Sequence, residues 1–259
     1  MSETTINQPA KMISIKELFK LSLAVYPTVF WKTIKMLLLP LVAFIPVGIL
    51  AILIVLVEDA SPAAGMSNFL YVILGLLGTV ATIFFLIVMY IAQIGAMIIV
   101  QKNDPQILIK DTFLLAKSKA WKFLTTSLWA GLFVFLWMLL FIIPGLVMMV
   151  YYTFIAWMVL EEGLSGKAAL KRSKGLVKDY WWAVFWRIVL PAIVIGIVFG
   201  TLGAKLLPPT TPGVPTPYTP GRAAYDFLTQ IISWVITPFF VAYSYNMYKS
   251  LKAIKDKQI

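Results

Sequence analysis

Glu161 and Glu162 are adjacent carboxylates and the acids of this sequence that come closest to a catalytic pair. General acid–base chemistry by two carboxylates needs both groups to face one substrate. The apolar run before Glu161 predicts that the pair ends a helix, where adjacent side chains point about 100° apart. We therefore expect structural ion pairs instead. The helix dipole disfavours negative charge at this end, and Lys167, Arg172 and Ser173 follow within a few turns.

Other catalytic side chains are scarce, since the sequence contains no histidine and no cysteine. Their absence excludes a Ser-His-Asp triad, a thiolate nucleophile, an axial haem histidine and any thiol or imidazole metal site. We therefore expect no catalytic residue, no metal and no cofactor. The chain is interpreted as a protein that is not an enzyme.

Two amides, Gln93 and Gln230, are the strongly polar side chains that lie well inside apolar segments. They can hydrogen-bond between helices, or they can line a polar path for a solute. Neither has a carboxylate or a basic partner, so bonding between helices is the preferred interpretation. The polar path leaves an alternative function open, a transporter or exporter of an uncharged or amphiphilic solute.

A row of four lysines suggests that the chain binds anions. Lys167, Lys171, Lys174 and Lys178 recur at spacings of four, three and four, which place them along one side of a helix whose other side is apolar. We expect this helix to lie on the membrane surface, apolar face down, with its lysines toward anionic headgroups at the cytoplasmic face. Membrane lipids are therefore the expected partners, and a protein partner or homo-oligomer stays open. Nucleic acid is not expected, although the net charge is +11.

The elements that carry these residues are membrane-spanning helices. Of the 259 residues, 61% are hydrophobic and 13% charged, whereas soluble domains are about 45–50% apolar and about 25% charged. The apolar residues form runs of the length that crosses a ~30 Å hydrocarbon layer. The sequence thus predicts an all-α, polytopic membrane helical bundle with six transmembrane helices, at 36–57, 69–100, 123–143, 146–160, 182–206 and 227–248. The Pro144-Gly145 pair is expected to form the turn between the third and fourth helices.

Lys and Arg are distributed unevenly between the two sides of these helices. Twenty of the 22 lie on the side of the two termini, and the opposite side holds only Lys205 and Arg222. The positive-inside rule makes the basic side cytoplasmic. We predict a multi-pass plasma-membrane protein with its N-terminus and C-terminus in the cytoplasm. Residues 1–13 are expected to be a disordered cytoplasmic tail, and 14–259 a single six-span membrane domain.

The basic segments resemble one another. Val-Phe-Trp followed by a cation occurs at 29–32 and at 184–187, and Trp-Lys occurs again at 121–122. Convergence is the alternative to duplication, because helices that enter a membrane favour Trp and Lys at the interface. We interpret residues of about 14–100, 105–160 and 165–250 as three pseudo-repeats. Each would be a basic amphipathic interfacial helix plus a helical hairpin.

Small polar residues are expected to start the three basic helices. Ser14 and Glu17 form a capping box, and Asp104 precedes Pro105 as an N-cap before a proline at the first helical position. Ser165 can start the third basic helix.

A stretch of about 45 residues resembles a bacterial membrane protein family. The shared pattern is a proline-glycine hairpin, an aromatic-rich helix, Glu-Gly, and an Ala-Leu-x-x-Ser amphipathic helix that leads into Trp. The matching residues are Pro144, Gly145, Tyr152, Glu162, Gly163, Ala169, Leu170, Ser173 and Trp182. This is the YciC-like integral membrane family, related to the membrane domain of glycerophosphoryl diester phosphodiesterases. Tyr151 departs from the pattern, since many members have arginine there.

The resemblance implies a membrane domain and not esterase activity, because the soluble catalytic barrel of the phosphodiesterase members is absent. Together with the basic helices, it predicts a lipid-associated scaffold or the membrane-domain partner of a lipid-metabolising system.

Overall fold

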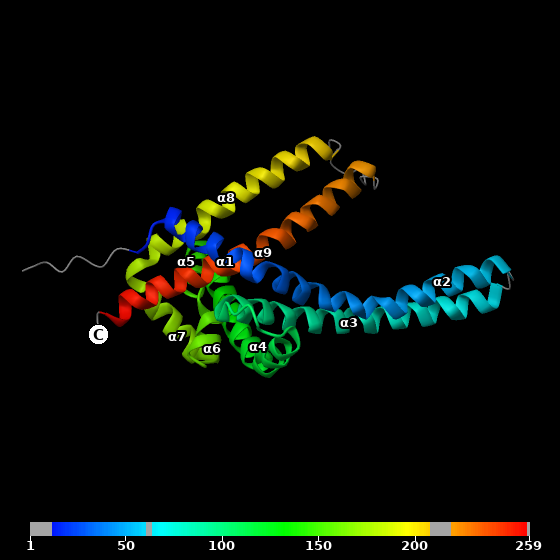
Figure 1. Ribbon diagram of the computed structural model, residues 1–259, viewed down its shortest axis with the longest axis horizontal. Coiled ribbons are helices and arrows are strands. Elements are labelled where there is room, and N and C mark those ends of the chain that lie inside the picture. Colours follow the sequence, from blue (N-terminus) through cyan, green and yellow to red (C-terminus); the bar gives the residue numbers. More distant parts are fainter. Residues whose placement is uncertain (1–11, 61–63, 208–218, 258–259) are drawn as a thin grey trace, which may run out of the picture. The chain divides into compact units, whose positions relative to one another are not determined.

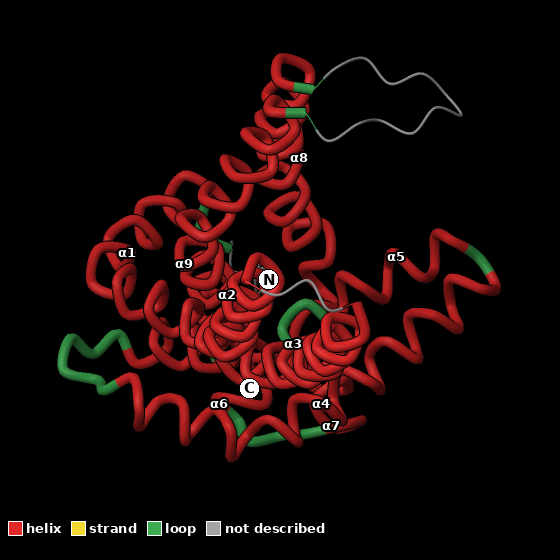
Figure 2. Tube along the Cα trace, turned by 90° about the vertical axis from the view of Figure 1, so that its right-hand side faces the viewer, coloured by secondary structure: helices red, strands yellow, loops and turns green. Residues whose placement is uncertain are grey.

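The computed structural model describes residues 12–60, 64–207 and 219–257. Within these ranges the chain is helical and contains no β-strand, as the tube in Figure 2 shows. Six helical segments are long and apolar enough to cross a membrane. The predicted all-α bundle of six spans is confirmed. Residues 1–11 of the predicted tail lie outside the described ranges.

Contacts along the chain divide it into two compact units. Unit 1 contains residues 1–27 and 121–259, and unit 2 contains residues 28–120. The boundaries fall inside helices α1 (Ile15–Leu38) and α4 (Ile109–Leu140). The single membrane domain and its three pseudo-repeats stay predictions.

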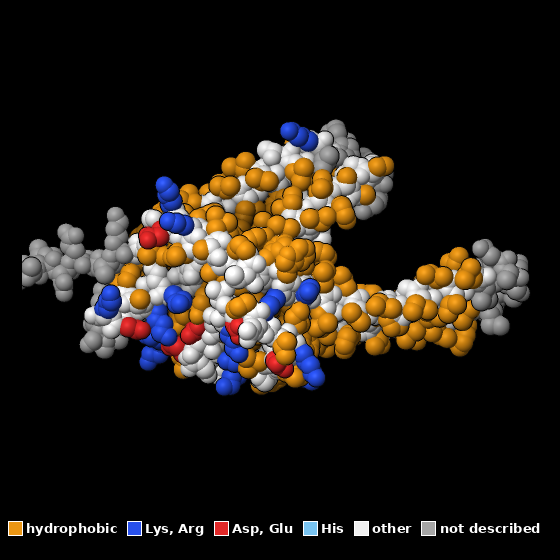
Figure 3. All heavy atoms as spheres, viewed as in Figure 1, with side chains coloured by type: hydrophobic (Ala, Val, Ile, Leu, Met, Phe, Trp, Pro, Cys, Tyr) orange, Lys and Arg blue, Asp and Glu red, His pale blue; other side chains and the backbone are white. Residues whose placement is uncertain are grey.

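Unit 2 is built around one helical hairpin. Helix α1 leads through the 3-10 helix η1 (Leu39–Phe44) into α2 (Ile45–Ala60), and α3 (Ala64–Lys102) runs back along η1 and α2. This hairpin is blue and cyan in Figure 1, and hydrophobic side chains cover it in Figure 3. Such a surface suits a hydrocarbon environment, because water would leave it unstable.

A lysine holds the chain where α3 ends and α4 approaches. The ammonium of Lys32 donates to the carbonyl oxygens of Asp104 at 3.2 Å and Ile107 at 3.1 Å, and also to that of Pro105. Asp104 was expected to cap a helix beginning at Pro105, but α4 begins at Ile109. The prediction is wrong because Lys32 occupies carbonyls that such a helix would use. The Asp104 carboxylate instead accepts the N–H of Gln106 at 2.8 Å.

Unit 1 contains the start of α1, most of α4 and the remaining helices. These are α5 (Ile142–Tyr151), α6 (Ile155–Glu161), α7 (Gly166–Val177), η2 (Lys178–Tyr180), α8 (Trp181–Leu206) and α9 (Pro220–Asp256). Helices α8 and α9 form a hairpin, yellow and orange in Figure 1. One of the two bonds of the predicted capping box is present at the start of α1, where the Glu17 N–H donates to Ser14 Oγ at 3.2 Å.

Arg187 in α8 makes a contact like that of Lys32. Its guanidinium donates to the carbonyl oxygens of Met12 at 3.3 Å and of Ile13 at 3.2 Å, where the chain enters α1. Lys32 and Arg187 are the cations of the two matching Val-Phe-Trp segments. In both units, therefore, this cation holds the backbone that leads toward a basic helix. The similarity supports duplication, which remains an interpretation.

The turn between the third and fourth spans lies earlier than predicted. Helix α4 ends at Leu140, Phe141 is extended with φ −156°, and α5 begins at Ile142. Pro144 therefore sits in the first turn of α5, where its missing N–H leaves no helical hydrogen bond unmade. Gly145 serves close packing, because a Cβ there would lie 2.1 Å from Met138 Cγ of α4.

Helix α7 differs from its predicted place on the membrane surface. Its apolar residues Leu170, Leu176 and Val177 are buried, and α7 contacts α5, α6 and α9. The prediction that this face rests on the membrane is wrong, because the face is used to pack α7 against other helices of unit 1. Helix α4 runs on from its basic segment without a break, whereas η1 separates α1 from α2 and η2 separates α7 from α8.

Candidate functional site

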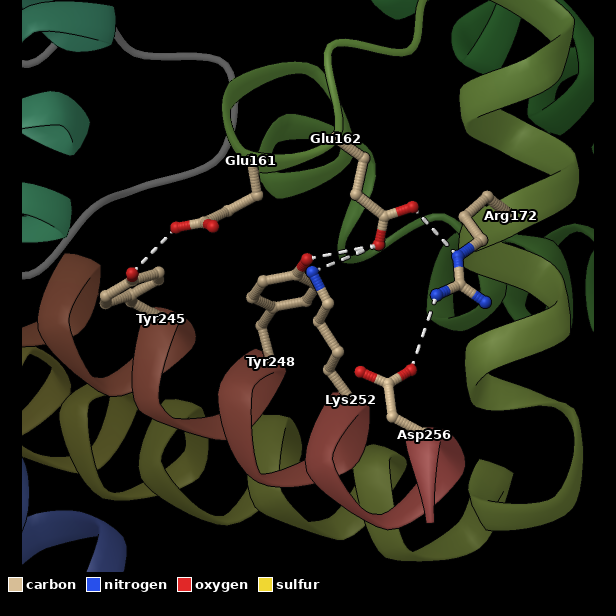
Figure 4. A network of polar contacts seen from close by, with 7 residues as sticks. All are labelled: Glu161, Glu162, Arg172, Tyr245, Tyr248, Lys252 and Asp256. Carbon is tan, nitrogen blue, oxygen red and sulfur yellow. Dashed lines mark hydrogen bonds and ion pairs between the residues drawn. The ribbon is translucent and has the colours of Figure 1, made fainter. Parts of the chain in front are cut away.

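A polar network joins three helices at one end of unit 1 (Figure 4). It comprises Glu161, Glu162, Arg172, Tyr245, Tyr248, Lys252 and Asp256, from the end of α6, from α7 and from α9. The chain can turn from α6 to α7 because Gly163 adopts φ +66°, a conformation that other residues rarely take. This turn places the glutamates between α7 and α9.

The Glu162 carboxylate is the centre of the network. It accepts from Arg172 Nε at 2.9 Å and from the Tyr248 hydroxyl at 3.3 Å, and Lys252 Nζ lies 3.6 Å away. Arg172 also lies 3.9 Å from the carboxylate of Asp256. The predicted ion pair with Arg172 is confirmed for Glu162, and together with Tyr248 and Lys252 it ties α7 and α9 to the end of α6.

The two glutamates face different partners. Glu161 accepts from the Tyr245 hydroxyl at 2.7 Å, whereas Glu162 binds Arg172, Tyr248 and Lys252. This arrangement follows from their helical positions, as predicted. The described geometry is that of two separate structural contacts and not of carboxylates that share one substrate.

Electrostatics favour the ionised form of Glu162. Burial raises the pKa of this carboxyl, but the hydrogen bond and charge of Arg172 and the charge of Lys252 outweigh burial. The pKa of Glu162 therefore lies below its ordinary value of 4.5. The network is an ion pair near neutral pH, and protonation of Glu162 would weaken it.

The other predicted partners of the glutamates bind elsewhere. Lys167 Nζ lies over the Trp129 ring at 4.4 Å from its centroid, a cation–π contact. The buried Ser173 hydroxyl donates to the carbonyl of Tyr151 at 2.7 Å and so fixes α7 against the end of α5.

Residues of α9 were missed by the sequence reasoning. Tyr245, Tyr248, Lys252 and Asp256 recur at spacings of three, four and four, which place them on one side of α9. That spacing was a usable signal. It says that the four residues share a face, but not that the end of α6 lies opposite that face.

The predicted lysine row is Lys167, Lys171, Lys174 and Lys178, and all four side chains are exposed. Lys174 lies over the ring of Tyr151, as Lys167 does over Trp129. Lys and Arg side chains gather around α7 in Figure 3. The apolar face of α7 is buried against other helices, and this packing fixes the orientation of α7. The lysine side chains therefore all lie on the exposed side of the helix.

Ser165 occupies the position before α7 but its side chain makes no capping hydrogen bond. The Gly166 N–H instead donates to Thr126 Oγ1 of α4 at 2.8 Å. The expected serine cap is replaced by a contact from another helix, which sequence spacing could not reveal.

The remaining residues of the family pattern have varied surroundings. Ala169 is fully buried, which allows α7 to approach its neighbours closely. Tyr152 ends α5, and its N–H donates to the carbonyl of Met148 at 3.0 Å. Trp182 is 67% exposed and its ring packs edge-on against Trp181.

Gln93 lies on α3 in unit 2 and Gln230 on α9 in unit 1. Both amides are exposed, and neither has a hydrogen-bond partner in the part of the chain that the structure describes. The helix-to-helix hydrogen bonds expected of them are not seen there.

Metal chemistry has no assembled ligand set in the described ranges, where no group of three or more His, Cys, Asp or Glu side chains could hold an ion. Comparisons of the chain with protein-family models, with curated proteins and with solved structures find no match.

Proposed function

We propose that this chain is a non-enzymatic integral membrane protein that associates with lipids. It would be a scaffold, or the membrane-domain partner of a lipid-metabolising system, in the plasma membrane with both termini in the cytoplasm. The observation that carries the proposal is the lysine row, because three exposed lysines on α7 and a fourth, Lys178, at its C-terminal cap lie along one side of unit 1's basic helix. Near an anionic membrane surface each lysine contributes about 1 kcal/mol.

The proposal includes membership of the YciC-like family. Several residues of the shared pattern have roles that require their type. Gly145 leaves room for Met138, Gly163 has a positive φ, and Glu162 binds Arg172. These local roles support the resemblance, because they give three residues of the pattern a structural reason for their type.

The proposal is tested by measuring which lipids surround the protein. The protein is extracted from its membrane in polymer-bounded discs, and the ratio of phosphatidylglycerol to phosphatidylethanolamine is compared with that of the whole membrane. We expect anionic lipid to be enriched around the wild type. The enrichment should fall in Lys171→Gln/Lys178→Gln, since neither lysine lies over an aromatic ring in the described contacts.

The matched control is Lys205→Gln/Arg222→Gln, which removes the same charge from the side predicted to be extracytoplasmic. It should keep the wild-type enrichment. Equal lipid ratios for the wild type and both double variants would contradict lipid association through the lysine row.

A further inference from the structure

Arg187 is an unusual cation for a membrane-spanning segment. It lies in α8, within the candidate span Gly166–Lys205, and its side chain is partly buried. Its guanidinium donates to neutral carbonyl oxygens, those of Met12, Ile13 and Ala183. No carboxylate among the described residues pairs with it. Its positive charge is therefore held without a carboxylate counter-ion among the described residues.

A proline and a tyrosine shape the surroundings of Arg187. Pro191 has no N–H, so it leaves the carbonyl of Arg187, four residues earlier, without its helical hydrogen bond. The Tyr243 hydroxyl of α9 donates to that carbonyl at 3.0 Å. This bond joins α8 to α9 next to the guanidinium.

A mostly apolar cavity of about 240 Å³ has Arg187 among its lining residues. Its polar lining comes from Arg187, Thr153, Tyr243 and Ser244. Ser244 Oγ accepts from Trp157 Nε1 at 3.0 Å, which leaves the serine O–H as a donor. The lining thus includes one cationic residue and one hydroxyl donor, a combination that suits a phosphate oxygen.

An apolar groove of about 440 Å³ lies next to this cavity. The two share Pro191 and Phe240 in their linings, and the groove runs between α1, α8 and α9. All of its lining residues are apolar, and among them Leu23 is 57% and Val194 61% exposed. The groove is therefore open on the outside of unit 1, where a hydrocarbon chain could enter from the bilayer.

We infer that the cavity and the groove bind one anionic phospholipid, with its phosphate beside Arg187 and an acyl chain in the groove. The inference rests on the proposed lipid association and adds a specific site to it. Charge decides the occupant, because a phosphate would supply the counter-ion that Arg187 lacks. The volume of the groove falls within the ~300–1,000 Å³ typical of small-molecule sites.

The test is native mass spectrometry of the full protein, delipidated in detergent and titrated with phosphatidylglycerol. We expect one phosphatidylglycerol to bind at least about tenfold more tightly than phosphatidylcholine, a difference of about 1.4 kcal/mol. Val194→Trp should fill the groove and weaken this binding about tenfold while leaving the Arg187 contacts intact. Ile193→Trp is the control, because Ile193 is exposed on α8 and does not line the groove.

Arg187→Gln should weaken phosphatidylglycerol binding at least as much as Val194→Trp. Arg187→Gln also removes the contacts with Met12 and Ile13, so this variant could fail to fold. In that case Val194→Trp alone tests the lipid site. Unchanged binding in Val194→Trp would overturn the site.

The lysine-row variant separates this inference from the proposed function. Lys171→Gln/Lys178→Gln should lose the enrichment of surrounding anionic lipid and still bind the single phosphatidylglycerol. If enrichment depends on the lysines but Val194→Trp binds normally, the site is wrong and the lipid association stands. If neither measurement responds to its variants, both are wrong.

Discussion

The Glu162 carboxylate depends on a cation from each of two helices, so loss of one leaves it poorly compensated. Arg172→Ala removes the closer cation, at 2.9 Å, while the Glu162 side chain is only 17% exposed. We expect the free energy of unfolding in detergent to fall by about 1.5–3 kcal/mol, the range for hydrogen bonds to charged groups. Lys171→Ala, on the exposed side of the same helix, should change it by less than about 0.5 kcal/mol. Equal stabilities of the two variants would contradict the network's structural role.

The lowered pKa of Glu162 predicts how stability depends on pH. A carboxyl with a lower pKa in the folded state stabilises the protein fully above its unfolded-state pKa. That contribution is lost as the pH falls through the folded-state pKa. The difference in unfolding free energy between the wild type and Glu162→Gln should be largest near pH 7 and shrink below an ordinary pKa of 4.5. Denaturant unfolding of both proteins across this range measures it, and a difference that grew on acidification would contradict the assignment.

For single residues, the sequence predicted one partner of Glu162 correctly, and that partner is close in the chain. The pairing of Glu162 with Arg172 followed from helix polarity and nearby charge, which are local properties. Tyr248 and Lys252 were missed because they are 86 and 90 residues away along the chain. Only the packing of α9 brings them to the end of α6.

The α4–α5 turn places a strict size limit on Gly145. A Cβ there would lie 2.1 Å from Met138 Cγ and 3.0 Å from its Cα, so the backbone of α4 would have to shift. Gly145→Ala should lower the free energy of unfolding by about 1–3 kcal/mol, as overpacking does. Gly131→Ala on α4 is the matched control. A Cβ at Gly131 meets nothing within 4 Å, and alanine favours a helix more than glycine does. Gly131→Ala should leave stability unchanged or raise it, and thermal unfolding followed by circular dichroism measures both variants.

Elements were predicted by hydrophobic run length, and their ends by capping residues. The runs were reliable because the ~30 Å bilayer core sets the length of a span whatever its tertiary contacts. The ends were less so. Ser165 precedes α7 as predicted, although Thr126 makes the bond expected of its side chain. Asp104 is a good cap by type, but α4 begins five residues later, at Ile109.

For the whole molecule, the uneven distribution of Lys and Arg predicts the orientation in the membrane. The chain has no cysteine, so single cysteines can report it without background. Lys205→Cys should react with an impermeant thiol reagent applied to intact cells. Lys171→Cys should react only after the membrane is opened. Mass shift of the purified protein reads out both, and the reverse pattern would overturn the predicted topology.

The contact of Arg187 with the start of α1 has a consequence for the order of events during synthesis. It joins residues 174 positions apart, whereas the Lys32 contact with Asp104 joins residues only 72 apart. At ~5–20 residues per second, a ribosome needs about 10–35 s to make the longer interval. The first helix made is therefore among the last to be secured. A nascent chain shorter than 187 residues lacks Arg187, and so it lacks the contact that holds the start of α1.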